Sequence, residues 1–428
     1  MWNESRCEDP TNVTERSERT LLPAVFLSTF LIRLGYGLAL GVYTFYLGNT
    51  VETAGLTAAA SPAIEASTVL FAGIAADRFG RLPILRVGLL FGSVLLFAMA
   101  FTRDPLYQTL ISGAFGLSSA SILAASLAVT GDVSARNERG FEMGRFDSFN
   151  LAGWIWGYAL GLILVSVLNG KAHPGNLSVV FDIGSGVVLV ALVALMALSR
   201  GLKETHIQRA FDRAEIKDAL LRTDVLLVVL PWMPIYMLLG ALFAFLGEAG
   251  STLNIPSWEL GGGILVAGSL LLFTQPFYGR LSDRLGRTRI MLVGVAGFLG
   301  VLLFGSLVAI FGINGLRALL IAGIGLSAIP ALAFGPSSLA ALTDSSRQSR
   351  RGTTMSFYSL SIATGMAVGL AVSSEFYTFW NTWGVVYFFA LVAALLALFT
   401  ALRIRRLHEL RLQETPPLNN HATAGPPK

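Results

Sequence analysis

The sequence predicts an all-α integral membrane protein in which twelve transmembrane helices form two pseudo-symmetric bundles of six. Three observations lead to this prediction. The chain has 428 residues, is 54% hydrophobic and only 13% charged, and has a mean hydropathy of +0.66, whereas soluble domains carry roughly 25% charged residues. Twelve apolar runs are long enough to span a bilayer. Two polar motifs of the first half recur in the second half, as expected of a duplicated chain.

The apolar runs fall into two groups of six, separated by a charged stretch. A spanning helix needs roughly 20 mainly apolar residues. The first group covers 21–47, 54–76, 82–102, 106–130, 146–169 and 177–199, and the second covers 224–247, 258–280, 288–312, 316–342, 354–378 and 383–403. We therefore expect an N-terminal six-helix bundle over 21–199 and a C-terminal six-helix bundle over 224–403. Prolines inside these runs, such as Pro276 and Pro330, predict kinks in their helices.

Three polar segments flank the two bundles. The N-terminal tail, 1–20, is polar, and the apolar run behind it is too long for the core of a signal peptide. The linker, 200–223, mixes charged and apolar residues at helical spacing, which predicts a surface helix on the cytoplasmic side or a simple tether. The C-terminal tail, 404–428, contains four prolines, and we expect it to be disordered.

The basic residues predict how the chain is oriented in the lipid bilayer. Arginine and lysine gather in the cytoplasmic segments of membrane proteins. If the N-terminus is cytoplasmic, all but four of the 31 basic residues fall on the inner side; the exceptions are Arg33, Arg103, Lys171 and Arg317. We therefore expect a multi-pass protein of the cell membrane with both termini in the cytoplasm.

Two polar motifs mark the duplication. The first, G-x-x-x-D-R-x-G-R, follows the second apolar run, and its copy follows the eighth. The other, D-x6-R-G, follows the fourth run, and its copy follows the tenth. Their members are Gly73, Asp77, Arg78, Gly80 and Arg81, repeated as Gly279, Asp283, Arg284, Gly286 and Arg287, and Asp132, Arg139 and Gly140, repeated as Asp344, Arg351 and Gly352. Because each half has an even number of helices, both halves enter the membrane from the same side, as parallel repeats do.

These motifs resemble those of the major facilitator superfamily of secondary transporters, and the likeness covers about residues 20–403. The resemblance implies two six-helix bundles around a central site that faces alternate sides of the membrane. It identifies the superfamily and says little about the substrate. The membrane-embedded arginine that many proton-linked members carry in the fourth helix is absent from this sequence.

The repeated motifs predict a gate at the cytoplasmic end. Asp77 is expected to meet the amino-terminal end of the eleventh helix, near Thr354, because that end carries a partial positive charge. By pseudo-symmetry, Asp283 is expected to face the start of the fifth helix, near Phe146. Such contacts form only when the cytoplasmic side is shut, and they would favour the outward-open state. The alternative is that the arginines of these motifs only fix the topology.

Two ionisable residues stand in the middle of apolar runs. Arg33 lies in the first run and Glu65 in the second, and each would cost roughly 2.5–3.5 kcal/mol on insertion scales if it were uncompensated. Because a short loop joins these helices, the two side chains can pair. Three alternatives stay open: Glu65 couples transport to protons, Arg33 binds an anionic group of the substrate, or the pair only fixes the packing of two helices.

Four further residues complete the predicted pathway. The aromatic side chains of Tyr36, Trp154 and Tyr236 are expected to line it, and Asp182, in the outer third of the sixth helix, is a further ionisable candidate. Asp147, at the inner start of the fifth helix, is expected to cap that helix.

The sequence predicts a secondary transporter and not an enzyme. All four histidines lie in predicted loops or tails, so no catalytic histidine cluster appears, and there is no Walker-type motif. A single cysteine excludes an internal disulfide and a multi-cysteine metal site, no metal or cofactor is implied, and the basic residues form no stripe for nucleic acid. We expect a monomer that exports a small amphipathic organic solute, coupled to protons through Glu65. The alternative is uptake or facilitated transport of an organic anion through Arg33.

Overall fold

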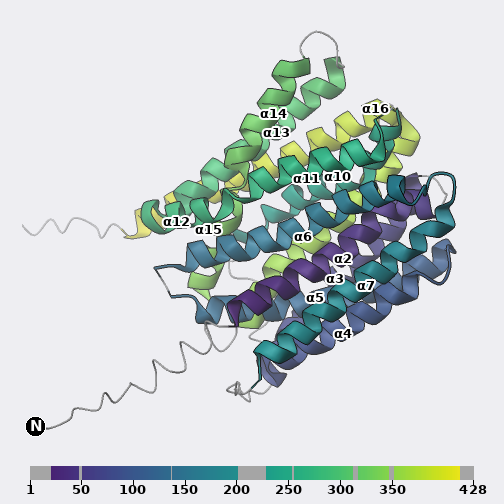
Figure 1. Ribbon diagram of the computed structural model, residues 1–428. Coiled ribbons are helices and arrows are strands. Elements are labelled where there is room, and N and C mark those ends of the chain that lie inside the picture. Colours follow the sequence, from purple (N-terminus) through teal and green to yellow (C-terminus); the bar gives the residue numbers. More distant parts are fainter. Residues whose placement is uncertain are drawn as a thin grey trace, which may run out of the picture.

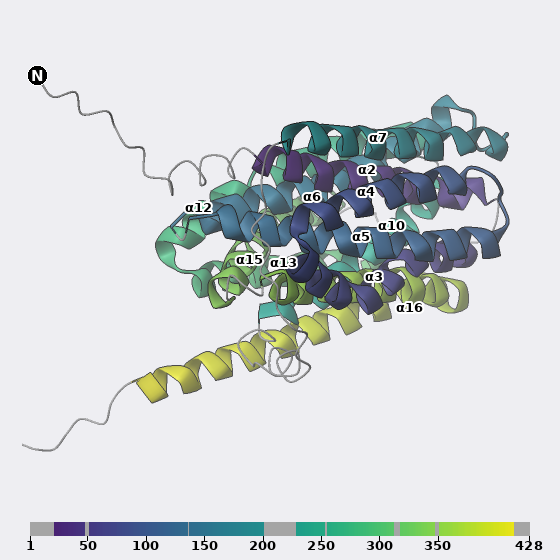
Figure 2. The same ribbon diagram turned by 90° about the horizontal axis from the view of Figure 1, so that it is seen from below.

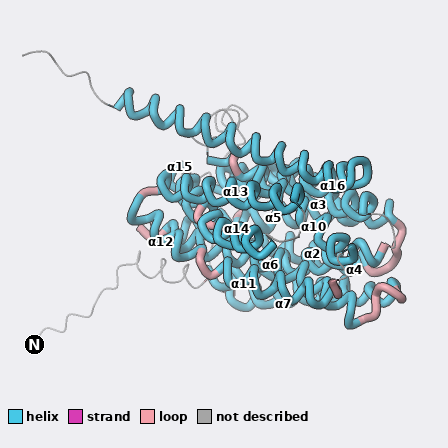
Figure 3. Tube along the Cα trace, turned by 90° about the horizontal axis from the view of Figure 1, so that it is seen from above, coloured by secondary structure: helices cyan, strands magenta, loops and turns pink. Residues whose placement is uncertain are grey.

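The protein is helical throughout the part that the structure describes. The computed structural model describes residues 21–47, 51–135, 137–200, 228–252, 255–311, 317–346 and 351–414. Within these ranges there is no strand, and short loops join the helices (Figure 3). The predicted all-α fold class is therefore confirmed.

Six helices and one short 3₁₀ turn form the N-terminal half. They are α2 (Leu22–Tyr46), α3 (Val51–Phe79), α4 (Arg81–Met99), α5 (Pro105–Val133), α6 (Arg139–Val167), η1 (Pro174–Leu177) and α7 (Ser178–Leu198). In Figure 1 these purple-to-teal helices occupy mainly the lower part of the molecule.

Within the described part of the C-terminal half there are seven helices. They are α10 (Trp232–Thr252), α11 (Ser257–Leu272), α12 (Gln275–Leu285), α13 (Arg287–Phe311), α14 (Arg317–Ala331), α15 (Phe334–Ser345) and α16 (Arg351–Glu414). Of these, α11 and α12 together make one membrane span and α14 and α15 make another. Within the described ranges, eleven helical segments are long and apolar enough to cross a membrane, and Trp232–Ala244 is a shorter apolar helix. Together they account for the twelve predicted spans.

Prolines divide two of the predicted spans. The eighth span is broken between Leu272 and Gln275, just before Pro276, and the tenth is broken between Ala331 and Phe334, just before Pro336, whereas Pro330 lies inside α14. Proline lacks a backbone N–H, so the carbonyl one turn earlier loses its helical partner. Each of the two spans that prolines were predicted to kink is therefore interrupted by two turn residues.

The last helix, α16, holds the eleventh and twelfth spans and reverses direction between them. The rings of Phe376 and Phe388 lie 6.2 Å apart, whereas twelve residues of straight helix rise about 18 Å. Arg403, near the end of the second span, contacts the sulfur of Met291 close to the start of α13. The two spans of α16 therefore form a hairpin.

Three segments differ from the predicted bounds or lie outside the described residues. The fifth span begins at Arg139 instead of residue 146. Its additional first two turns form the helix end that meets the other half, where the N–H group of Gly140 donates to Asp283. The predicted disordered tail is wrong for 404–414, since α16 continues to Glu414 (Figure 2); this stretch has no proline or glycine and is rich in good helix formers. The predicted linker helix lies outside the described residues, apart from Arg200.

Glycines let α2 and α6 approach closely and so place Arg33. A β-carbon on Gly161 would lie 3.0 Å from the Cα atom of Gly41, and one on Gly157 would lie 2.8 Å from that of Gly37. Gly153 packs in the same way against the β-carbon of Arg33. The backbone of α6 therefore contacts the helix that carries the central arginine.

Candidate functional site

At one end of the molecule the two halves are joined by a polar network, and we call the end where Arg81, Arg139, Arg287 and Arg351 lie the arginine-rich end. Asp77, at the end of α3, accepts hydrogen bonds from the backbone N–H groups of Gly352 (3.0 Å) and Thr353 (2.8 Å) at the start of α16. The hydroxyl of Thr353 donates a third bond at 2.8 Å. Asp77 therefore caps a helix of the opposite half, as predicted.

Asp283 makes the pseudo-symmetric contact. Its two carboxylate oxygens accept from the backbone N–H groups of Gly140 (3.1 Å) and Phe141 (3.2 Å) at the start of α6. The first turn of a helix leaves such N–H groups without partners inside the helix, and it carries the positive end of the helix dipole. The predicted contact is confirmed, although it falls at Gly140 and Phe141 instead of Phe146.

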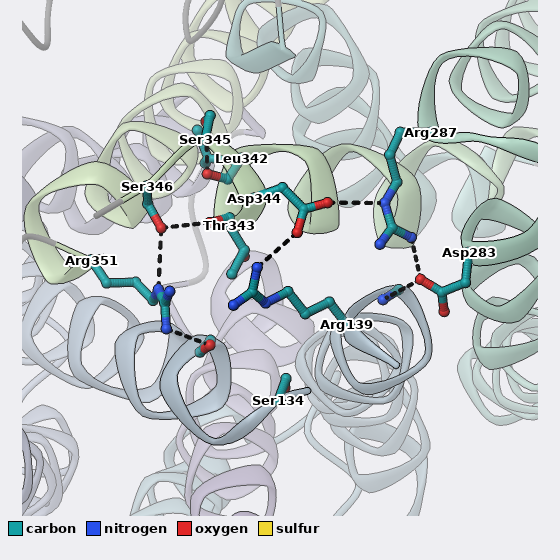
Figure 4. A network of polar contacts seen from close by, with 12 residues as sticks. Ser134, Arg139, Asp283, Arg287, Leu342, Thr343, Asp344, Ser345, Ser346 and Arg351 are labelled. Atoms are coloured by element: carbon teal, nitrogen blue, oxygen red, sulfur yellow. Dashed lines mark hydrogen bonds and ion pairs between the residues drawn. The ribbon is translucent and has the colours of Figure 1, made fainter. Parts of the chain in front are cut away.

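Arginine side chains extend the two caps into a network between the halves. Arg351 of α16 donates to Asp132 (2.8 Å) and to the carbonyl of Gly131 (2.6 Å) on α5. Its counterpart, Arg139 of α6, donates to Asp344 of α15 at 2.8 Å. Figure 4 shows Arg139 and Arg287 converging on the Asp344 carboxylate from opposite sides. In each half an arginine also joins the two acids of its own half: Arg81 contacts Asp77 and Asp132, and Arg287 contacts Asp283 and Asp344.

The motif glycines serve two separate purposes. Gly80 and Gly286 adopt φ values of 94° and 98°, which residues with a side chain rarely adopt. Gly73 lies against the other half, since a β-carbon there would lie 2.7 Å from the carbonyl oxygen of Gly352. A β-carbon on Gly279 would overlap the carbonyl of Gly140 in the same way. The second pair of glycines therefore allows α3 to meet α16 and α12 to meet α6.

Two of the predicted motif arginines lie apart from the network. Arg78 and Arg284 are exposed, and neither has a carboxylate within 4.0 Å among the described residues. Arg78 lies over the ring of Phe79 at 5.3 Å. Their charges remain available to lipid phosphates or solvent.

Arg33 and Glu65 form the predicted pair in the N-terminal half. The guanidinium donates to both carboxylate oxygens, at 3.0 and 3.2 Å, and the two residues are only 3% and 2% exposed. Ser119 accepts from Arg33 at 2.6 Å and donates to Glu65 at 2.7 Å, while Nε of Arg33 donates to Asn150 at 3.1 Å. Four of the five N–H donors of the guanidinium are thus engaged, so both charges are compensated.

The predicted aromatic residues surround this pair. Trp154 lies over the guanidinium of Arg33, with 5.0 Å between the ring centroid and the central carbon. Tyr36 stacks on Phe115, meets Trp154 edge to face, and donates to the carbonyl of Ala58 at 3.0 Å. Trp154 in turn stacks on Phe243 of the C-terminal half, 6.0 Å away. Trp154 therefore links the Arg33 pair to the interface between the halves.

Asp147 was predicted to cap the fifth helix, and this prediction is wrong. It lies more than two turns after the start of α6 and so does not cap that helix. Its side chain is fully buried, and one carboxylate oxygen accepts from the hydroxyl of Tyr358 on α16 at 2.9 Å. Asp147, Asn150 and Trp154 are spaced three and four residues apart, which places them on one face of a helix. That spacing was the signal in the sequence that Asp147 belongs with the central residues.

A cavity of about 180 Å³ lies beside Asp147, between α6 and the C-terminal half. Gln275, at the break between α11 and α12, and Gly335, at the break between α14 and α15, line it with Tyr236 of α10. The remaining walls are mainly leucine, isoleucine and other apolar side chains. Of the predicted pathway residues, Tyr236 therefore reaches this cavity directly.

The other candidates lie elsewhere. Asp182 is exposed on α7 and lines neither the cavity nor the Arg33 pair. Within the described ranges, no group of three His, Cys, Asp or Glu residues is placed to hold a metal ion.

These features define a class of membrane protein: a transporter with two repeated helical bundles that close against each other around buried polar side chains. The chain belongs to the Major Facilitator Superfamily, whose family profile matches residues 25–273 and 237–424. The resemblance seen in the sequence motifs is thereby confirmed.

Similar proteins fall in the same superfamily. The chain is 26% identical over 293 residues to YybF, an uncharacterized MFS-type transporter of Bacillus subtilis strain 168. That match covers 65% of this chain and 66% of YybF, so it spans just under two thirds of the relative's length. Among solved structures, the human organic anion transporter MFSD10 is 16% identical, with a TM-score of 0.66 over 90% of this chain and 99% of that one. The proton:xylose symporter XylE, bound to 6-bromo-6-deoxy-D-glucose, is also 16% identical, with a TM-score of 0.68 over 90% of this chain and 95% of that one. At this identity the two structures support the fold alone.

Proposed function

We propose that this protein is a secondary transporter that exports a small amphipathic organic solute across the cell membrane by alternating access. Both termini and the arginine-rich end are in the cytoplasm. The observation that carries the proposal is the pair of reciprocal caps, in which Asp77 and Asp283 each hold the first turn of a helix in the opposite half. These contacts are non-covalent and exist only when the two halves meet, so their rupture allows the cytoplasmic end to open.

The halves also meet away from the arginine-rich end. Tyr158 of α6 donates to the backbone carbonyl of Phe243 on α10 at 3.0 Å. Contacts on both sides of the buried polar centre fit an occluded state, from which either end can open. Alternating access needs such a state, because a solute must lose access to one side before it gains access to the other.

The proposed solute class follows from the cavity wall. A cavity bounded mainly by leucine and isoleucine favours an apolar body. Proton coupling requires a carboxyl group that can gain and lose a proton in the membrane. Glu65, the group chosen from the sequence, can do so only if Arg33 and Ser119 release it.

Organic-anion transport through Arg33 is a second candidate. It has one supporting observation, the central and buried position of the guanidinium. However, Glu65 neutralises that charge, and Ser119 and Asn150 occupy further donors. An anion would first have to displace Glu65, which makes this candidate less favourable.

Transport in sealed vesicles tests the proposal. An imposed pH gradient should drive movement of an amphipathic solute, and the double substitution Asp77→Asn and Asp283→Asn should slow it by weakening both caps. Glu65→Gln separates the coupling alternatives, since pH-driven transport that survives this substitution excludes Glu65 as the proton carrier. If a broad panel of amphipathic solutes and organic anions shows no movement under any gradient, the transporter proposal is wrong.

A further inference from the structure

Two buried oxygen atoms beside the cavity lack hydrogen-bond donors. They are Oδ2 of Asp147 and Oε1 of Gln275, and neither accepts a hydrogen bond from any of the described residues. Asp147 is 0% exposed and Gln275 is 1% exposed, so both side chains are buried. A buried acceptor without a donor costs about 1–3 kcal/mol, and a buried charge without a counter-ion costs more.

The two oxygen atoms face the same place. A β-carbon built on Gly335 would overlap Oδ2 of Asp147 and lie 3.3 Å from Oε1 of Gln275. Both residues line the cavity, and Gly335 lines it with them. One donor group placed between the two oxygen atoms would therefore satisfy both.

In the part of the chain that the structure describes, no basic side chain supplies that donor. Among the described residues, none lies within 4.0 Å of Asp147, and the cavity wall contains no arginine, lysine or histidine. The titratable groups around Asp147 are the hydroxyl of Tyr358 from α16, which binds the other carboxylate oxygen, and Tyr236 from α10. Arg33, across α6, is already engaged by Glu65. If the amide of Gln275 is turned so that its nitrogen faces Asp147, the negative charge still lacks a cation.

The cavity has room for one apolar ring. Its volume is about 180 Å³, and an engineered protein cavity of about 150 Å³ binds benzene. Leu151 and Ile155 of α6 form one wall, and Leu239 and Phe298 of the C-terminal half contribute to the others. An acid in the wall of a mainly apolar cavity suits a molecule with an apolar body and a cationic group.

We infer that this cavity binds a small lipophilic amine, with its ammonium group between Asp147 and Gln275 and its apolar body against the leucine-rich wall. A proton on Asp147 fills the same position when the amine is absent, so proton and amine compete for one site. The inference rests on the proposed function, because it names the solute class and makes Asp147, in place of Glu65, the group that exchanges the proton.

Binding to the purified full-length protein in lipid nanodiscs tests this inference. Three probes of similar size are compared by calorimetry: 2-phenylethylamine, neutral 2-phenylethanol and anionic 3-phenylpropanoate. The amine should bind at least tenfold more tightly than the other two. Asp147→Asn should weaken amine binding at least tenfold and leave the binding of the alcohol unchanged, whereas Asp182→Asn, which changes an exposed carboxylate, should leave both unchanged. Equal amine binding by Asp147→Asn, or tighter binding of the anion, would overturn the inference.

A measurement on the unsubstituted protein covers the case in which Asp147→Asn does not fold. In a weakly buffered solution with a pH indicator, amine binding should release up to one proton per site, because the ammonium displaces the proton of Asp147. Amine binding without proton release would contradict the inference.

A labelling experiment separates this inference from the proposed function. Ile235 lines the cavity, and Ile235→Cys can be labelled from either side of a vesicle membrane if access alternates. If no amine binds while labelling occurs from both sides, only the inference is wrong. If labelling occurs from one side alone, the proposed function is wrong as well.

Discussion

Replacing Asp77 by asparagine should weaken the closure of the arginine-rich end. The carboxylate accepts two backbone bonds and one hydroxyl bond from the first turn of α16. Asparagine keeps one acceptor oxygen and loses the negative charge that favours a helix amino terminus. The three hydrogen bonds from α16 exist only when the halves are in contact, whereas the contact of Asp77 with Arg81 lies within one half, so the substitution destabilises the closed end more than the open end.

The size of the effect follows from the contacts. A hydrogen bond to a charged group contributes about 1.5–3 kcal/mol and one between neutral groups about 0.5–1.5 kcal/mol, and a charge near a helix end adds about 0.3–1 kcal/mol. Since asparagine retains part of the hydrogen bonding, we expect a loss of about 1–2 kcal/mol, or a factor of about 5–30 in the ratio of closed to open molecules. Asp283→Asn, which weakens two backbone bonds, should act in the same direction.

Electron paramagnetic resonance can measure this ratio. Asn137 and Arg284 line one surface pocket from opposite halves, so spin labels on Asn137→Cys and Arg284→Cys, in a Cys7→Ser background, report the opening of the arginine-rich end. Asp77→Asn should increase the population with long distances, and Asp182→Asn should not. An unchanged distance distribution in Asp77→Asn would refute the reasoning.

Two further predictions concern packing and stability. Arg33→Ala should lower the free energy of unfolding by about 3–5 kcal/mol, because it leaves a buried carboxylate without its partner. In thermal unfolding, the double substitution Arg33→Met and Glu65→Leu should recover much of this loss. If the losses of the two single substitutions simply add in the double variant, the two residues are not a pair. Gly73→Ala and Gly279→Ala should lengthen the spin-label distances, as opening of the arginine-rich end does, since each added methyl group meets the backbone of the other half. Gly263→Ala is the control: a β-carbon at that position has no other atom within 4 Å, so this variant should behave like the unsubstituted protein.

The sequence predicted the contacts of Asp77 and Asp283 with the opposite half because their physical cause is local and repeated. An acid at a helix end, an arginine one turn later and a positive-φ glycine between them stand at matching positions in both halves. A carboxylate at that position has few partners other than the N–H groups of a neighbouring helix end. The Arg33–Glu65 pair was predictable for a related reason, since each charge is too costly in an apolar run without the other.

The spacing along α6 indicates which face Asp147 lies on, but its surroundings were not predictable in the same way. Its surroundings depend on two helix breaks, near Gln275 and Gly335, which bring residues of distant spans to one face of α6. Prolines signalled these breaks, but the pattern of apolar residues does not reveal which helix packs against them. The continuation of α16 past residue 403 was also not predicted. The expectation of disorder came from the prolines of the tail as a whole and not from the run of good helix formers that precedes them.

Alternating access requires a buried centre that is reached from one side of the membrane at a time. Labelling of Ile235→Cys, in a Cys7→Ser background, with a membrane-impermeant maleimide measures this directly in right-side-out and inside-out vesicles. We expect Ile235→Cys to be labelled in both vesicle orientations. Asp77→Asn should raise the labelling rate from the cytoplasmic side and lower it from the outside. Labelling from one side only, or rates that rise together on both sides, would contradict alternating access.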